Sequence, residues 1–316
     1  MTQLENGLFI EEARPAAETG VPVVLCHGFP GSWHSWRNQL PVLAAAGHRA
    51  IAPDMRGYGR SLSPKDPADY DRATTVADMT SLLDELGIEK AVFVGHDFGA
   101  QLTWDLPSWA PERVAGLIQL SVPRMPRSPI APSQAYAYMA RKHFLHFHYF
   151  KETGVADAEL DARPAEFLRR LFFALSGAGD YLSCWDFPAE GNGYLDVLPE
   201  APALPWPWLS EEDFAYYVSE FTRAGFTGGL NWYRAADAVW EQNAGRDDQP
   251  ITVPTAFIAG AEDPVLTMMG RECLDTMAGL VPGLRSTTVL PGAGHFVQME
   301  AADKVNAAML EFLGGL

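Results

Sequence analysis

Short apolar runs alternate with amphipathic stretches through the first 120 residues of the chain. Runs of apolar and β-branched residues between turn residues predict strands. We place these strands at Val21–Cys26, His48–Pro53, Ala91–Val94 and Val114–Leu120. Apolar residues recur near helical spacing at Thr75–Leu86, before Gly87, and a second helix is expected at Gly99–Trp109. This alternation is typical of an α/β protein whose parallel sheet is covered by helices on both faces.

The pattern changes after Pro123. Four prolines interrupt the next stretch, at positions 123, 126, 129 and 132, and residues 133–245 are helix-like and rich in aromatic side chains. Strands resume at Val253–Ala259 and Ser286–Leu290, and a last helix is expected from about Ala302. Both flanks are needed to complete one sheet. We therefore expect a core domain made of residues 1–123 and 246–316, with a helical cap inserted at residues 124–245.

Composition excludes several classes of function. The 316 residues carry 23 Lys and Arg against 40 Asp and Glu, a formal net charge of −17, which disfavours nucleic-acid binding. No apolar run approaches the roughly 18–20 residues of a membrane span, and the N-terminus is acidic where a signal peptide would be basic. Only Cys26, Cys184 and Cys273 are present, which suggests no disulfide framework and fits the cytoplasm.

The strongest local signal is Gly95-His96-Asp97-Phe98-Gly99-Ala100, which follows a strand and opens a helix. This context is that of a nucleophile elbow, a sharp turn that needs small residues on either side of its apex. Serine is usual at the apex, and here it is Asp97. The structural alternative is an ordinary turn in which Asp97 caps the helix.

Two further residues complete a catalytic order. An α/β-hydrolase presents nucleophile, acid and base in that order, each after the C-terminal end of a strand. Asp263 follows the strand at 253–259, and His295 follows the strand at 286–290. Glu262 competes with Asp263 for the role of the acid, and we favour Asp263. Each residue alone could belong to a turn, but all three in this order indicate a triad.

The segment His27-Gly28-Phe29-Pro30 follows the first strand, where the loop of an oxyanion hole belongs. The backbone N–H groups of Phe29 and Phe98 would form its donor pair. A plain β-turn is the alternative.

An aspartate nucleophile changes the class of reaction. Attack by a carboxylate on an ester or amide would give an anhydride, whereas attack on a saturated carbon gives an alkyl ester of Asp97. Water activated by His295 would then hydrolyse that ester. Both an epoxide oxygen and a halide fit as leaving groups at this point.

The chain resembles the soluble epoxide hydrolases of the α/β-hydrolase fold over nearly its whole length. The stretches that carry the resemblance are HGFPGSWHSWR (27–37), DMRGYGRS (54–61), GHDFGA (95–100), GVADAEL (154–160), LNWYR (230–234), AEDPV (261–265) and GHFVQME (294–300). It implies a mostly parallel eight-stranded sheet with a helical cap over the elbow. It also implies that Asp97 is the nucleophile, Asp263 the acid and His295 the base.

The resemblance further implies two cap residues that polarise the epoxide oxygen. Tyr233, in LNWYR, matches the first. The second is usually a tyrosine about eight residues before the GVADAEL-like stretch, and counting back from Gly154 gives His146. Some relatives use a His/Tyr pair, so we assign His146 and keep Tyr149 as its rival. Neutral imidazole N–H and phenol O–H can each donate to that oxygen.

Dehalogenases share the aspartate elbow and are the alternative enzyme. Haloalkane dehalogenases typically place Trp after the nucleophile, where this chain has Phe98. Fluoroacetate dehalogenases pair the cap His with Trp, where this chain has Phe147, and carry arginines at the positions of Phe98 and Gln101. A non-catalytic binding protein is a third possibility, which the complete triad disfavours.

The aromatic cap favours a neutral, apolar or aromatic epoxide as substrate. Trp33, Tyr149 and Phe296 are further candidates for substrate contact. We expect no cofactor and no metal, because ring strain drives the first step and ester chemistry carries the second. The oligomeric state is not predicted.

Overall fold

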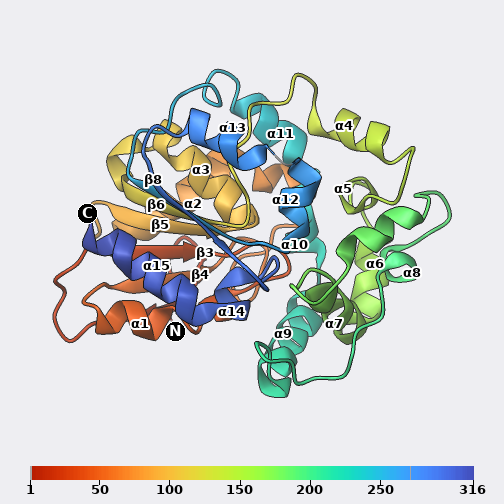
Figure 1. Ribbon diagram of the computed structural model, residues 1–316, viewed down its shortest axis with the longest axis horizontal. Coiled ribbons are helices and arrows are strands. Elements are labelled where there is room, and N and C mark those ends of the chain that lie inside the picture. The colour runs from red at the N-terminus through yellow and green to blue at the C-terminus, as the bar shows by residue number, and fades with distance from the viewer. Residues whose placement is uncertain (1, 271) are drawn as a thin grey trace.

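The strands of the protein form one mixed sheet (Figure 1). The computed structural model describes residues 2–270 and 272–316, and the eight strands found there lie in the order β1-β2-β4-β3-β5-β6-β7-β8. The pairs β1–β2 and β2–β4 are antiparallel, and all other neighbours are parallel. The strands are β1 Thr2–Gln3, β2 Phe9–Ala13, β3 Val23–Cys26, β4 Ala50–Asp54, β5 Ala91–His96, β6 Val114–Leu120, β7 Thr255–Gly260 and β8 Leu284–Leu290.

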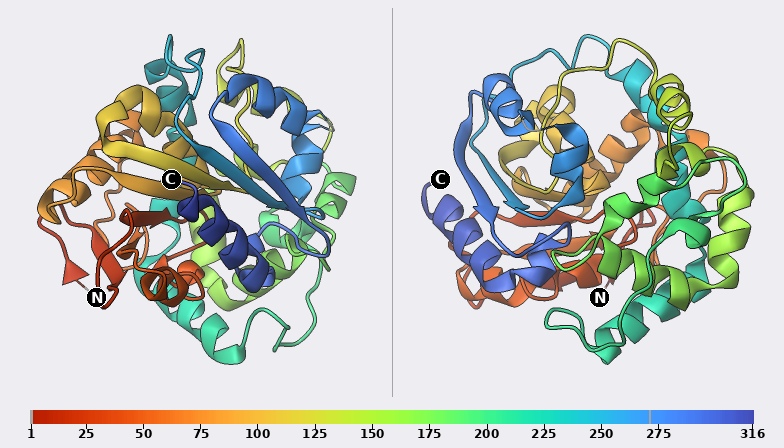
Figure 2. Two further views of the ribbon diagram at one scale, coloured as in Figure 1. Left: turned by 60° about the vertical axis from the view of Figure 1, so that its left-hand side comes forward. Right: turned by 45° about the vertical axis from the view of Figure 1, so that its right-hand side comes forward.

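Two apolar layers cover the two faces of this sheet, because successive side chains of a strand point to opposite faces. In β3, Val23 and Leu25 pack with α1 and α15, whereas Val24 and Cys26 pack with α2 and α3. The two views of Figure 2 show helices on both sides of the strands. The core helices are α1 Leu40–Ala45, α2 Arg72–Glu85, α3 Phe98–Trp109, α12 Pro264–Met269, α13 Cys273–Leu280, α14 Val297–Glu300 and α15 Ala302–Gly314. Among the described residues, none of the helices combines the length and the apolar character that a membrane span requires.

The α/β architecture confirms the prediction, with shifts at the ends of elements. Strand β5 continues through His96, so it runs directly into the turn at Asp97, and α2 begins at Arg72 rather than Thr75. The antiparallel strands β1 and β2 were not predicted. The first is only two residues long and exposed, and the second, Phe9-Ile10-Glu11-Glu12-Ala13, buries only its first two residues.

The structure describes all of residues 124–245. This segment contains helices and no strand of the sheet. We refer to these residues as the helical insertion, and Figure 1 shows most of it in green and cyan beside the core. Its helices are α4 Pro132–Met139, α5 His146–Tyr149, α6 Val155–Ala162, α7 Pro164–Ala174, α8 Tyr194–Val197, α9 Glu211–Ala224, α10 Thr227–Arg234 and α11 Ala236–Gln242, with the 3₁₀-helix η4 at Tyr181–Asp186.

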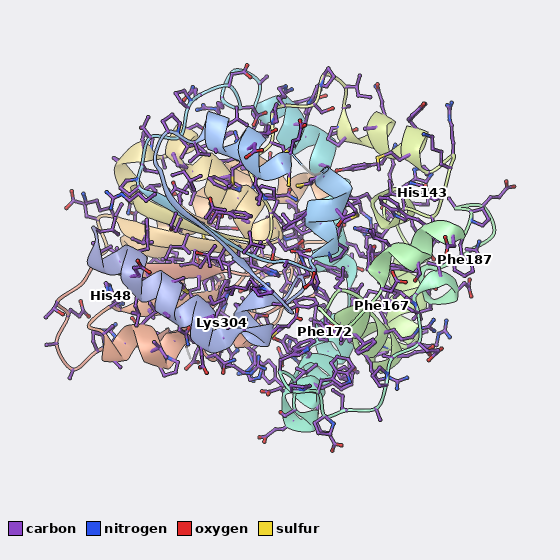
Figure 3. The ribbon with its side chains drawn as sticks, viewed as in Figure 1. His48, His143, Phe167, Phe172, Phe187 and Lys304 are labelled. Atoms are coloured by element: carbon purple, nitrogen blue, oxygen red, sulfur yellow. The ribbon has the colours of Figure 1, made fainter. Side chains whose placement is uncertain are left out.

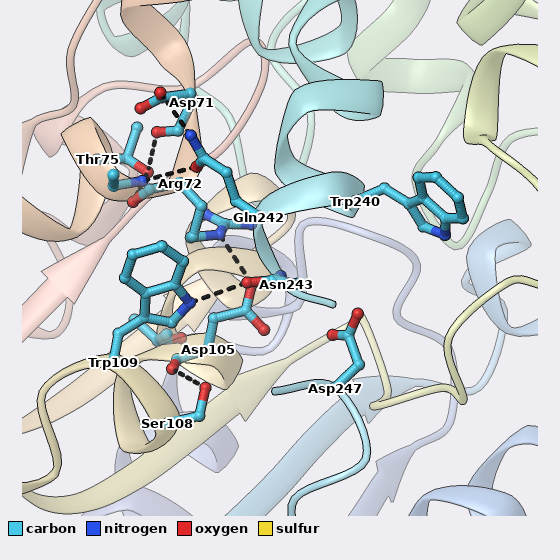
Figure 4. Close-up of polar contacts among 12 residues, drawn as sticks. Asp71, Arg72, Thr75, Asp105, Ser108, Trp109, Trp240, Gln242, Asn243 and Asp247 are labelled. Carbon is cyan, nitrogen blue, oxygen red and sulfur yellow. Dashed lines mark hydrogen bonds and ion pairs between the residues drawn. The ribbon is translucent and has the colours of Figure 1, made fainter. Parts of the chain in front are cut away.

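A polar network around Asp105 of α3 ties both ends of the helical insertion to the core, and Figure 4 labels its members Arg72, Trp109 and Asn243. The Asp105 carboxylate pairs with Arg72 of α2 at 2.8 Å and with Arg124, at the start of the insertion, also at 2.8 Å. Asn243, at the end of the insertion, donates to Asp105 at 2.7 Å and accepts from the indole of Trp109 at 2.9 Å. The chain therefore leaves and re-enters the core at one buried charged cluster.

Candidate active site

Asp97 stands at a strained turn between β5 and α3. Its φ of 55° lies in a region that favours glycine, and its ψ is −119°. A Cβ at Gly99 would lie 2.0 Å from the carbonyl oxygen of Cys26, and a Cβ at Gly95 would lie 2.6 Å from the Cα of Ala100. The turn thus requires glycine on both sides. The side chain of Asp97 makes no helix-capping hydrogen bond, so it is free to face the cavity.

The loop after β3 holds the carboxylate of Asp97. The backbone N–H of Phe29 donates to Oδ1 of Asp97 at 2.8 Å. Gly28 passes so close that a Cβ there would lie 2.2 Å from the same oxygen. Phe98, the other predicted donor, is the first residue of α3, and its ring lines the cavity.

His295 lies between two carboxylates. Its Nε2 is 3.6 Å from Oδ2 of Asp97, and its Nδ1 is 3.2 Å from Oδ2 of Asp263. Glu262 turns away and accepts a hydrogen bond from the backbone of Gly292 at 3.1 Å. The structure therefore brings Asp97, Asp263 and His295 together, and Glu262 is not in contact with the imidazole.

These contacts set the charges of the site. Burial opposes a charge on His295, but the Asp263 carboxylate, with a smaller contribution from Asp97, raises the pKa of the imidazole to about 10. Burial by itself would raise the pKa of Asp97, yet His295, His96 and the amide of Phe29 hold it below its ordinary value. At neutral pH the resting site holds an ionised Asp97 beside a protonated His295.

Three residues that the sequence analysis did not assign position His295. Its backbone carbonyl accepts hydrogen bonds from Nε2 of His96 at 2.7 Å and from the hydroxyl of Ser121 at 2.8 Å. Glu300 accepts from the backbone N–H groups of Gly294 at 3.0 Å and of Phe296 at 3.1 Å. His96 lies within the elbow motif and Glu300 ends the GHFVQME stretch, whereas Ser121 only follows a predicted strand and had no motif to mark it.

A cavity of about 260 Å³ lies between Asp97 and the helical insertion. Its wall is largely apolar and aromatic, with Asp97 and His295 contributed by the core and Tyr233 and His146 by the insertion. The aromatic residues of the wall are Phe29, Phe98, Tyr136, Phe147, Tyr181, Tyr194 and Tyr233.

Tyr233 and His146 are both neutral in this cavity. The Tyr233 ring meets the Phe98 ring edge-on, with centroids 4.5 Å apart, and its centroid is 5.7 Å from that of His146. Burial raises the pKa of Tyr233 well above its ordinary value and lowers the pKa of His146 to about 3. His146 keeps some accessible surface, but it lines the enclosed cavity, which accounts for its loss of hydration. The two side chains can therefore act as uncharged donors.

Trp33 and Phe296 were candidates for substrate contact. Neither is among the described residues that line this cavity. The Trp33 ring lies 5.8 Å from the Tyr216 ring of α9, and the Phe296 ring packs edge-on to Phe172 of α7 at 4.9 Å. Both belong to the contact between core and insertion; Figure 3 labels Phe172 there.

Tyr149 is likewise not among the described residues that line the cavity. Its hydroxyl donates to Oε2 of Glu159 at 2.8 Å. His143, three residues before His146, stacks on Trp185 with centroids 4.3 Å apart and lies at the outer side of the insertion (Figure 3). Of the histidines at 143, 146 and 148, only His146 lines the cavity.

Known proteins resemble this chain over almost its full length. A family model described as the alpha/beta hydrolase fold matches residues 21–302. Epoxide hydrolase A of Mycobacterium tuberculosis is 46% identical, over 95% of this chain and 93% of its own length. Epoxide hydrolase 1 of Siraitia grosvenorii is 37% identical, over 98% of this chain and 96% of its own length.

Solved structures of epoxide hydrolases are also similar to this chain. The crystal structure of epoxide hydrolase A from Mycobacterium thermoresistibile has a TM-score of 0.89 and 45% identity, covering 98% of this chain and 96% of that one. An epoxide hydrolase from an endophytic Streptomyces has a TM-score of 0.92 and 37% identity, covering 99% of this chain and 94% of that one.

Proposed function

This chain belongs to the α/β-hydrolase fold family and is one of its epoxide hydrolases, and we propose that Asp97 opens the epoxide by direct attack on a ring carbon. The observation that carries this mechanism is the placement of the Asp97 carboxylate: it lines the cavity, with Oδ1 held by the amide of Phe29 and Oδ2 3.6 Å from His295. A carboxylate so held is a nucleophile for a saturated carbon.

In the proposed first step, one Asp97 oxygen bonds to a ring carbon as the bond from that carbon to the epoxide oxygen breaks. Tyr233 and His146, on the opposite wall, donate hydrogen bonds to the epoxide oxygen, on which charge develops. The product is a 2-hydroxyalkyl ester of Asp97 once that oxygen has taken a proton from the Tyr233 hydroxyl, which regains one from solvent. His295 in turn gives up its proton to solvent as its pKa falls, so the step balances. Tyr233 and His146 suit this role because both are uncharged donors at neutral pH.

Formation of the ester also prepares the second step. It removes the negative charge of Asp97, one of the two charges that keep His295 protonated, so the pKa of His295 falls. The neutral imidazole takes a proton from water, and the hydroxide attacks the ester carbonyl. Phe29 and Phe98 N–H groups would stabilise the resulting oxyanion. The alkoxide oxygen of the diol leaves with the proton from His295. The acid form of Asp97 then passes its proton to His295, which restores the resting pair.

The substrate that we propose is a small, neutral, apolar or aromatic epoxide. Support comes from the wall of the cavity, which is rich in aromatic residues and carries no Lys or Arg among the residues that line it. The dehalogenase alternative gains nothing from the comparisons, since the relatives named above are epoxide hydrolases.

We propose that residues 124–245 act as a cap over a core of residues 1–123 and 246–316. The cavity supports this division, because the core supplies Asp97 and His295 and the insertion supplies His146 and Tyr233. We also propose a cytoplasmic location, in keeping with cysteines 26, 184 and 273, each free and buried.

A single turnover in ¹⁸O-labelled water tests the covalent route. With enzyme in excess, the label should enter the carboxylate of Asp97, while the first diol released carries an oxygen that came from the enzyme. Peptide mass spectrometry locates the label. Label in the diol alone would contradict attack by Asp97, and halide release from a haloalkane, with no diol formed from any epoxide, would favour the dehalogenase.

A further inference from the structure

His146 is the end of a chain of buried hydroxyl groups. Its Nδ1 lies 2.5 Å from the hydroxyl of Tyr181, and that hydroxyl lies 2.9 Å from the hydroxyl of Tyr194. Tyr181 begins η4, Tyr194 begins α8, and the two side chains are only 4% and 2% exposed. Neither tyrosine is used in the mechanism above.

The tautomer of His146 decides what this residue can do. A neutral imidazole has one N–H and one bare nitrogen, and only the N–H can donate to the epoxide oxygen. If Nδ1 carried the proton, Nε2 would present a lone pair and would repel that oxygen. If Nδ1 accepts a hydrogen bond, Nε2 must carry the proton.

The direction of the hydroxyl chain follows from counting protons. In one direction Tyr194 donates to Tyr181 and Tyr181 donates to Nδ1 of His146, so every hydroxyl proton has an acceptor. In the other direction His146 donates to Tyr181, Tyr181 donates to Tyr194, and the proton of Tyr194 is left without an acceptor among the described residues. A buried donor without an acceptor costs more than an acceptor with a spare lone pair, so the first direction is favoured.

The charge of the cavity favours the same direction. Asp97 is ionised and lines the cavity together with His146, and its electrostatic effect on His146 exceeds the opposing effect of the protonated His295. An N–H dipole directed into a cavity that holds a carboxylate is stabilised, whereas a lone pair directed there is destabilised. Two independent terms therefore favour a proton on Nε2.

We propose that Tyr181 is a positioning residue that holds His146 in its Nε2–H tautomer, with Tyr194 as the donor that completes the chain. This proposal rests on the proposed role of His146 as a donor to the epoxide oxygen. Tyr181 acts through His146, and its hydroxyl has no proton left to offer to the substrate.

Glu159 explains how the far end of the chain is held. Its carboxylate accepts hydrogen bonds from the backbone N–H groups of Tyr194 at 3.0 Å and of Leu195 at 2.9 Å, which fixes the start of α8. The hydroxyl of Tyr149 binds the same carboxylate at 2.8 Å. Tyr149 thus supports the hydroxyl chain from outside the cavity.

The tautomer can be measured without substrate. In protein labelled with ¹⁵N in its histidine rings, the shifts of the two ring nitrogens show which one carries the proton, and the His146→Gln variant identifies the resonances of His146. We expect a bare Nδ1 and a protonated Nε2 in the native protein. A protonated Nδ1 would overturn the proposal, whatever the activity of any variant.

The kinetic test is a double-mutant cycle on the rate of ring opening, followed in single turnovers. Tyr181→Phe should slow ring opening about tenfold, the kinetic equivalent of one ordinary hydrogen bond, and leave ester hydrolysis unchanged. In a His146→Phe background the same change should have no further effect, because Tyr181 acts through His146. A further tenfold loss in that background would contradict the proposal.

Tyr217→Phe is the matched control. Tyr217 is a fully buried tyrosine of the insertion, and its hydroxyl bonds to Ser35 at 3.0 Å outside the cavity. Its loss should cost stability and leave ring opening unchanged. If His146→Phe alone leaves ring opening at the native rate, the proposed role of His146 in catalysis fails. The ring-nitrogen shifts would still decide the tautomer separately.

Discussion

A β-carbon on Gly28 would lie 2.2 Å from Oδ1 of Asp97, closer than any non-bonded contact allows. The two residues come from different strand ends, and the amide of Phe29, next to Gly28, donates to the same oxygen. Gly28→Ala should therefore displace the carboxylate and slow ring opening by about 100-fold, as small misplacements of a reacting group do. Rapid-quench measurement of ester formation checks this.

Gly279 supplies the control for that substitution. It lies in α13, and a Cβ there would meet no atom within 4 Å. Gly279→Ala should leave both steps of the reaction unchanged. A Gly28→Ala variant with native ring-opening rates would show that the tight approach has no catalytic importance.

Replacing His295 with Gln should separate the two steps of the reaction. Asp97 keeps its place at the elbow, so the epoxide still alkylates it, but the base for ester hydrolysis is gone. Intact-protein mass spectrometry should show a mass increase equal to that of the substrate, located on Asp97. The Asp97→Ala variant should show no increase, and a folded His295→Gln protein that keeps its native mass in excess epoxide would refute the scheme.

Replacing Asp263 with Asn should lower the pKa of His295. The Asp263 carboxylate is the main cause of its rise to about 10, so the variant should titrate nearer the ordinary value of about 6.5, as NMR of the ring would show. A folded-state pKa above the unfolded one stabilises the fold fully below about pH 6.5, and this stabilisation is lost as pH rises towards 10.

The same change therefore has a signature in stability. From pH 7 to 9, wild type should lose up to about 1.4 kcal/mol of unfolding free energy per pH unit relative to Asp263→Asn. Urea denaturation at several pH values measures the difference. Parallel stability curves for the two proteins would contradict the assigned charge on His295.

Asp105→Asn should destabilise the whole protein. The carboxylate is only 4% exposed and pairs with Arg72 and Arg124, so its loss leaves the buried Arg72 without its ion pair and Arg124 with Asp247 alone. We expect a loss of about 3–5 kcal/mol in the free energy of unfolding. Asp84→Asn is the control, because Asp84 is 67% exposed in its pair with Arg113 and should cost less than about 1 kcal/mol. Equal effects of the two variants would show that the cluster at the base of the insertion does not stabilise the fold.

The elements that the sequence predicts well are those whose signals are local. Strands β3, β5 and β6 consist mostly of apolar residues, so their burial could be predicted from the sequence of each strand alone. The turn at Asp97 was recognisable because small residues on both sides of it are a steric necessity. By contrast, β1 is too short and exposed to leave a pattern.

Contacts between distant parts of the chain could not be predicted in this way. Trp33, Tyr149 and Phe296 lie beside recognised motifs, but proximity in sequence does not determine which way a side chain points, and all three pack outside the cavity. The pairing of Tyr181 with His146 joins residues 35 positions apart in the chain, with no motif around Tyr181 to indicate it.

The carbonyl of His295 is held by His96, the last residue of β5, and by Ser121, which directly follows the neighbouring strand β6. Base and nucleophile thus share one rigid frame, whereas Tyr233 and His146 belong to the helical insertion. The core therefore holds the nucleophile and its base, while the two proposed oxygen donors come from the insertion. A substitution confined to the insertion should thus alter the opening of the epoxide alone, whereas a distortion at these strand ends should impair both halves of the turnover.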